Sequence, residues 1–121
     1  MKVAFISDSL KRPEHQGIIK TLEHLMDFYV AETVDEFEQK HGNLKSYDGM
    51  FFHSSGSKKG LDYIKKTYPN LKIILISMSL SHLTDKYDID ETGCYYNNTL
   101  LVCRDVAYEK MLSFLQGEKI E

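Results

Sequence analysis

Short apolar runs alternate with amphipathic segments along the chain. The apolar runs are rich in β-branched and aromatic residues, which favour strands. We therefore expect strands at Lys2–Ser7, Phe28–Thr33, Tyr47–His53, Leu71–Ile76 and Thr99–Cys103. The run at 71–76 is nearly continuous in apolar residues, as in a strand that is covered on both faces of a parallel sheet. The segment 94–96 is expected to pair with the last strand as a hairpin across Asn97-Asn98, because asparagine tolerates the positive φ of such a turn.

Between these runs, apolar residues recur at the spacing of amphipathic helices. The first helix is expected to end at Asp27 and to bury one stripe, formed by Ile18, Ile19, Leu22, Leu25 and Met26. The second is expected at Val34–His41, with Thr33 and Glu36 as a capping box and Gly42 as a left-handed cap. Two further helices have apolar faces formed by Leu61, Ile64 and Tyr68 before Pro69, and by Ala107, Met111, Phe114 and Leu115 between Asp105 and Gly117. Residues 77–93 have no clear periodicity.

The alternation of strands and helices predicts one α/β domain over residues 1–121. Because crossovers between parallel strands are right-handed, the helices should cover both faces of the sheet. We expect a three-layer α/β/α sandwich around a five-stranded parallel sheet with the flavodoxin-like strand order 2-1-3-4-5.

Composition narrows the classes of function. Hydrophobic residues make up 42% and charged residues 27% of the chain, which is typical of a globular domain. The net charge of −3 argues against general nucleic-acid binding, because proteins that bind the phosphate backbone are normally basic. Cys94 and Cys103 match no metal-site spacing and are expected to be reduced thiols. No apolar run approaches the roughly 20 residues that span a membrane, and the apolar stretch at the N-terminus is too short for a signal peptide. We therefore expect a cytoplasmic protein.

Polar residues follow the predicted strands, at the edge where α/β proteins usually bind ligands. Asp8 and His53 end two strands that should be adjacent, so they could form an acid/base pair or two ligands of a metal, although a lone histidine is more often structural. The strand order predicts a cleft between their loops, lined by Asp8, Ser9, His53, Ser54 and Ser57. The remaining histidines, His15, His24, His41 and His82, show no ligand spacing with one another or with Asp8.

Two hydroxyl-rich segments complete the candidate site. The loop 54–60 precedes a helix, so its amides could hold an anion at Ser55 to Lys58, although it lacks the residue order of a Walker loop. The alternative is that Ser57 caps the helix and that the lysines are solvated. Ser77 and Ser79 follow the most apolar strand, where turn formation and helix capping explain them better than ligand binding does.

In length and element order the whole chain resembles the receiver domain of response regulators and, less closely, the flavodoxins. In receivers, acidic residues after strand one hold magnesium, an aspartate at the end of strand three takes the phosphoryl group, and a hydroxyl and a lysine end strands four and five. Asp8 matches one acidic position, and Ser77 or Ser79 matches the hydroxyl. His53, Ser54 and Ser55 stand where the aspartate is expected, and Cys103-Arg104 near the lysine. The resemblance therefore implies a degenerate receiver that is not phosphorylated in the usual way and that lacks most magnesium ligands.

The flavodoxin resemblance rests on MKVAFISDS and YDGMFFHSSGS, which look like strands one and three of that family. The first loop lacks the hydroxyl-rich turn that grips the FMN phosphate, and the chain has no tryptophan. A phosphatase of the haloacid dehalogenase type needs a second aspartate where Leu10 stands. Neither flavin binding nor that activity is expected.

Three hypotheses of function follow. The first is a non-enzymatic, receiver-like regulatory module that binds a protein partner, favoured by the acidic balance and the missing phosphoacceptor. The second is a small-ligand binder that takes a phosphorylated metabolite or nucleotide at the carboxyl edge of the sheet, favoured by the loop 54–60. A hydrolase that uses Asp8, His53 and the serines ranks third. No cofactor and no membrane association are expected, and a homodimer is compatible with the sequence.

Overall fold

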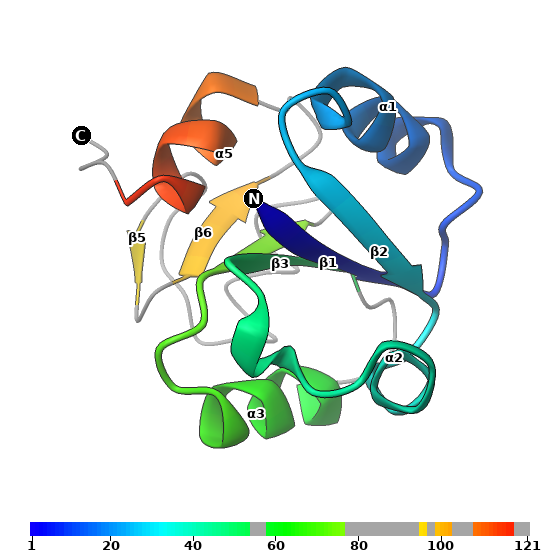
Figure 1. The fold of residues 1–121 in the computed structure, drawn as a ribbon, viewed down its shortest axis with the longest axis vertical. Coiled ribbons are helices and arrows are strands. Elements are labelled where there is room, and N and C mark those ends of the chain that lie inside the picture. The colour runs from blue at the N-terminus through cyan, green and yellow to red at the C-terminus, as the bar shows by residue number, and fades with distance from the viewer. Residues whose placement is uncertain (54–57, 77–94, 97–98, 103–107, 118–121) are drawn as a thin grey trace.

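A single sheet organises the described part of the molecule (Figure 1). The structure is a computed structural model that describes residues 1–53, 58–76, 95–96, 99–102 and 108–117. Within these residues the strand order is β2-β1-β3-β4-β6-β5. The strands are β1 (Lys2–Ser7), β2 (Asp27–Ala31), β3 (Gly49–His53), β4 (Ile73–Ile76), β5 (Tyr95–Tyr96) and β6 (Thr99–Val102). The predicted α/β class with a parallel sheet is confirmed.

Within the described residues the sheet has six strands, because the short strand β5 pairs with β6 in addition to the parallel strands. All the other adjacent strands run parallel, whereas β5 and β6 are antiparallel, with Tyr96 opposite Thr99. This is the expected hairpin. Cys94 and the turn at 97–98 lie outside the described residues.

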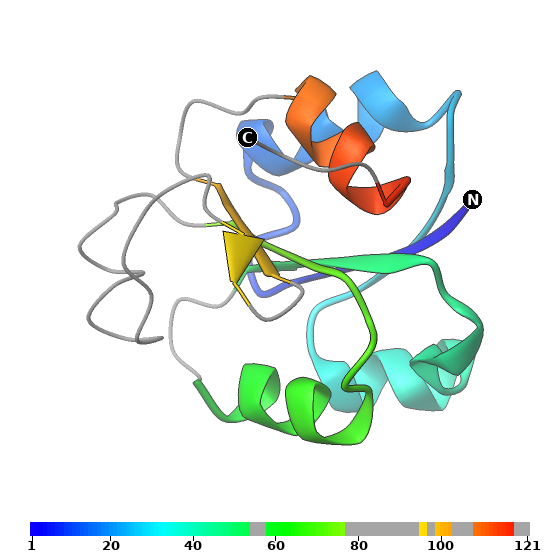
Figure 2. The same ribbon diagram turned by 90° about the vertical axis from the view of Figure 1, so that its left-hand side faces the viewer.

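The helices lie on both faces of the sheet. The helices α1 (Pro13–Leu22) and α5 (Tyr108–Leu115) cover one face, and α2 (Val34–His41) and α3 (Lys58–Thr67) cover the other (Figure 2). Side chains alternate along β1 accordingly: Val3 and Phe5 pack in the cluster with α1 and α5, whereas Ala4 and Ile6 pack in the cluster with α2 and α3. No helix in the described ranges is both long enough and apolar enough to cross a membrane.

The first helix is shorter than predicted. It ends at Leu22, and the amides of Leu25 and Met26 both bond to the Leu22 carbonyl in a tight turn. This turn brings Asp27 beside Lys2, where β2 begins. Leu25 therefore leaves the apolar stripe and is 48% exposed, whereas Met26 remains buried. The strands β3 and β4 also begin two residues later than predicted, because the preceding residues form turns, including a 3-10 turn at Leu44–Ser46.

The second helix is confirmed at its predicted bounds. The Glu36 amide donates to the Thr33 hydroxyl oxygen (3.1 Å), which satisfies one of the unpaired amides of the first turn. At the other end Gly42 has a φ of 84°, which favours glycine, and its amide bonds to the Glu38 carbonyl.

Removing this cap gives a first prediction. Thr33→Ala is expected to lower the free energy of unfolding by about 1 kcal/mol, because the Glu36 amide loses its side-chain acceptor. Urea denaturation measures the change, and Thr33→Ser serves as the control because serine keeps the acceptor oxygen. Equal losses in both variants would show that the hydroxyl does not cap the helix.

Candidate functional site

Asp8 and His53 meet at the carboxyl edge of the sheet, as the strand order predicted. Ser7, the last residue of β1, stands opposite His53, the last residue of β3. Asp8 follows β1 directly, and its carboxylate oxygen Oδ1 lies 3.1 Å from Nδ1 of His53. His53 is 6% exposed and Asp8 39% exposed. The two side chains therefore contact each other directly, with the imidazole buried and the carboxylate at the surface.

A second histidine, His15, forms a cluster with Asp8, His53 and Ser7, and the sequence analysis did not predict this. His15, in the first turn of α1, is 1% exposed, and its ring packs edge-on against that of His53 with centroids 4.7 Å apart. The signal was present in the spacing, because His15 shares the buried face of α1 with Ile18 and Leu22 at i, i+3 and i+7.

Hydrogen bonds fix His15 on the loop between β1 and α1. Its Nδ1 lies 3.0 Å from the Ser9 carbonyl oxygen and 2.9 Å from Oγ of Ser7. Because a carbonyl oxygen only accepts, this nitrogen carries a proton. The Ser9 amide donates in turn to Oγ of Ser7 (2.9 Å), and the Arg12 amide donates to the Ser9 carbonyl (3.0 Å). One side chain thus connects the end of β1, the loop and the start of α1.

The surroundings of His15 favour its neutral form. Burial lowers the pKa of His15 below its ordinary value, and the neighbouring His53 lowers it further. Arg12 acts in the same direction, whereas the hydrogen bond to the Ser9 carbonyl and the charge of Glu14 partly oppose them. The cluster therefore holds two imidazoles beside one carboxylate, and that carboxylate contacts His53.

The described residues around Asp8 do not fit the magnesium site that receivers have, in agreement with the degenerate receiver that the resemblance implies. Magnesium requires near-octahedral oxygen ligands, and Asp8 supplies the carboxylate here. Its neighbour Ser7 is buried, and Oγ of Ser7 already contacts the Ser9 amide and His15. The described residues contain no group of three histidine, cysteine or acidic side chains that could hold a metal ion.

The structure tests only part of the predicted ligand site. Ser9 lies beside Asp8, and its hydroxyl donates to Oδ1 of Asp8 over 3.3 Å. Lys58 begins α3. The other predicted residues lie outside the described part of the chain: Ser54, Ser55, Ser57, Ser77, Ser79 and the Cys103-Arg104 pair. The predicted anion site at Ser55 to Lys58 therefore stays a prediction.

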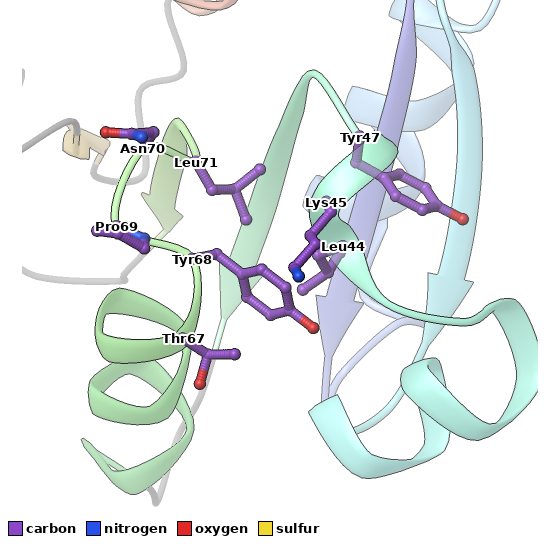
Figure 3. A pocket seen from close by; sticks show the side chains of 8 residues that line it. All are labelled: Leu44, Lys45, Tyr47, Thr67, Tyr68, Pro69, Asn70 and Leu71. Atoms are coloured by element: carbon purple, nitrogen blue, oxygen red, sulfur yellow. The ribbon is translucent and has the colours of Figure 1, made fainter.

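A pocket of about 290 Å³ lies at the opposite edge of the sheet (Figure 3). It is bounded by the residues before β3 and β4, whereas the Asp8–His53 pair lies where β3 ends. Its lining mixes apolar and polar side chains, namely Leu44, Lys45, Tyr47, Thr67, Tyr68, Pro69, Asn70 and Leu71. The Tyr68 hydroxyl donates to Oε2 of Glu38 (2.7 Å), which anchors the end of α3 to α2. The sequence analysis did not predict this pocket, because it depends on the 3-10 turn at Leu44–Ser46.

Comparison with known proteins identifies the fold. The sequence itself matches no known family and no curated protein. Among solved structures, the BeF3-activated receiver domain of DrrB is 14% identical over 96% of this chain and 94% of that one, with a TM-score of 0.63. The isolated receiver domain of RcsB from Salmonella enterica serovar Typhimurium, determined with phosphomimetic BeF3, is 21% identical over 99% and 91% of the two chains, with a TM-score of 0.65.

A longer chain also matches. The OmpR/PhoB homologue DrrB of Thermotoga maritima is 17% identical, with a TM-score of 0.66, over 98% of this chain but only 54% of that one. The match therefore covers about half of that response regulator. At these identities the likeness shows the fold alone, and the protein has the fold of a response-regulator receiver domain.

Proposed function

We propose that this protein is a non-enzymatic, receiver-like regulatory module that acts in the cytoplasm by binding another protein. We propose further that it is not phosphorylated on an aspartate at the end of strand three. The observation that carries this proposal is the residue in which β3 ends: it is His53, with Nδ1 held 3.1 Å from the carboxylate of Asp8. We also propose that the domain is the three-layer α/β/α sandwich that the sequence predicts.

The chemistry of that contact supports the proposal. In an aspartyl-phosphate mechanism, the carboxylate at this position is the nucleophile, and a metal ion neutralises the charge that gathers around it. An imidazole cannot form an acyl phosphate. Placed beside Asp8, His53 instead supplies a hydrogen-bond donor to the carboxylate that a metal would otherwise engage. This contact joins the ends of β1 and β3 at the edge of the sheet.

The structural neighbours support a partner protein. DrrB and RcsB are response regulators, and the receiver domain is one part of the longer DrrB chain. A receiver fold without its phosphorylation chemistry retains the surfaces of its helices for contact with another protein. We propose a partner protein that contacts these helix surfaces.

The first experiment tests phosphorylation. Incubation with acetyl phosphate and magnesium is expected to leave the intact mass of this protein unchanged, because β3 ends in His53. A receiver with an aspartate at the end of strand three, treated in parallel, controls for the activity of the phosphodonor. A stoichiometric mass gain that is stable to acid, labile to base and located on a carboxylate would overturn the proposal.

The second experiment asks what the protein carries. Native mass spectrometry of the protein as purified from its own cells is expected to show a second polypeptide in complex with it. A retained nucleotide, flavin or metal ion in place of a polypeptide would favour the small-ligand hypothesis instead.

A further inference from the structure

The two buried histidines, His15 and His53, pack against each other, and the carboxylate of Asp8 contacts His53. Asp8 faces His53, whereas the ring of His15 contacts a hydroxyl, a carbonyl and other rings, and Glu14, its neighbour in the sequence, is exposed. Among the described residues, the groups that face His15 are the Ser7 hydroxyl from β1, the Ser9 carbonyl from the loop, His53 from β3, Arg12 at the start of α1 and Glu14 in its first turn. The ring of Phe5 covers it, with centroids 5.7 Å apart.

We propose that the cluster of Ser7, Asp8, His15 and His53 is a proton-operated switch that holds or releases the loop between β1 and α1. This inference rests on the proposed function, because it gives the module an input other than phosphorylation. In the closed state His15 is neutral and holds the loop through Ser7 and Ser9. In the open state the imidazole of His15 takes up a second proton, and His15 leaves its buried position for water.

The geometry explains why a proton on His15 opens the cluster. Protonation places a cation in a buried position 4.7 Å from the ring of His53, which faces Asp8. A buried charge without an opposite charge is strongly unfavourable, whereas the same charge is well solvated at the surface. His15 is near the start of α1, so the first turn of the helix can move without disturbing the central strands.

The same contacts explain why the loop follows His15. Ser7 and Ser9 both contact Nδ1 of His15, and Arg12 is bonded to the Ser9 carbonyl. When the imidazole leaves, the loop loses the side chain that joins the end of β1 to the start of α1. Asp8 lies in this loop, so a movement of the loop also alters the contact between Asp8 and His53.

The pH dependence has a defined sign. The unfolded chain protonates His15 near its ordinary pKa of 6.5, whereas the folded protein does so only at lower pH. Below pH 6.5 the unfolded state therefore binds more protons, so the stability that the closed cluster contributes is lost as the pH falls through this value towards the folded pKa. Above it, the contribution is fully present.

The test is an NMR titration of the imidazole Cε1–H signals and the backbone amides of the intact protein between about pH 7.5 and pH 5. We expect His15 to titrate below 6.5, and the amides of Ser9 and Arg12 to shift with the same midpoint. In a parallel denaturation series, the urea concentration at the unfolding midpoint should decrease as the pH is lowered over this range. In the His15→Gln variant most of this decrease should be absent. His24→Gln, at an exposed histidine, is the matched control and should keep it.

Two outcomes would overturn the switch. One is a His15 that titrates at or above 6.5, and the other is a titration of His15 that leaves the loop amides unmoved. The titration of the unmodified protein decides the matter even if His15→Gln does not fold. An aspartyl phosphate in the acetyl phosphate experiment would overturn the proposed function but would not alter this titration, so the two failures can be distinguished.

Discussion

Replacing Phe51 by alanine is expected to lower the free energy of unfolding by about 3–5 kcal/mol, through lost burial and the cavity left behind. Phe51 is fully buried in β3, between β1 and β4. Its ring stacks on that of Phe5 with centroids 5.4 Å apart and packs at a tilt against Phe28 at 5.7 Å. Few neighbours can move into the space, because β3 is bonded on both sides. Urea denaturation followed by circular dichroism measures the loss.

Phe28→Ala is the matched control for this substitution. Phe28 contacts the same ring from the edge strand β2, where it is only partly buried. Phe28→Ala should therefore lower the free energy of unfolding clearly less than Phe51→Ala does. Equal or reversed losses would mean that the packing between β1, β3 and α1 differs from that described.

The elements with strong local signals could be predicted from the sequence. The run at Lys2–Ser7 is bounded by a charged residue at each end, and β1 has these limits. The second helix has a threonine cap before it and a glycine after it, and both predicted ends are confirmed. In these cases the residues that set the boundary are next to it in the sequence.

Boundaries that depend on tertiary packing could not be predicted. The spacing of Leu25 fits the stripe of α1, but the chain must turn at Leu22 so that Asp27 can pair with Lys2. The 3-10 turn at Leu44–Ser46 has no strong sequence signal, and it buries Leu44 and delays the start of β3. Local periodicity contains no information about where the neighbouring strand begins.

The candidate site was predicted in part for a similar reason. The proximity of Asp8 and His53 could be predicted from the strand order, because both residues come at the ends of adjacent parallel strands, whereas their direct contact is seen only in the structure. His15 has no ligand spacing with the other histidines, so the sequence does not mark it as part of the site. Its contact with His53 depends on how α1 packs across the sheet, and the helical spacing of His15 with Ile18 was the available signal.

The second large effect is expected in β4. Ile74→Ala should lower the free energy of unfolding by about 2–5 kcal/mol, because the substitution removes buried methyl groups and leaves a cavity. Ile74 is fully buried and stands between Phe51 of β3 and Leu100 of β6 in the sheet. Its side chain belongs to the cluster with Phe114 of α5 and Ile18 of α1, so the cavity would lie in the core beneath both helices. Urea denaturation at constant pH measures the change.

Leu25→Ala controls for the loss of an aliphatic side chain as such. Leu25 is exposed in the turn after α1, so its removal should change the stability by no more than about 0.5 kcal/mol. The difference between the two variants isolates burial in the central sheet, because both shorten a branched four-carbon side chain to a methyl group. A loss below about 1 kcal/mol for Ile74→Ala would mean that β4 is not an interior strand. The place of β4 in the order β2-β1-β3-β4-β6 would then need revision.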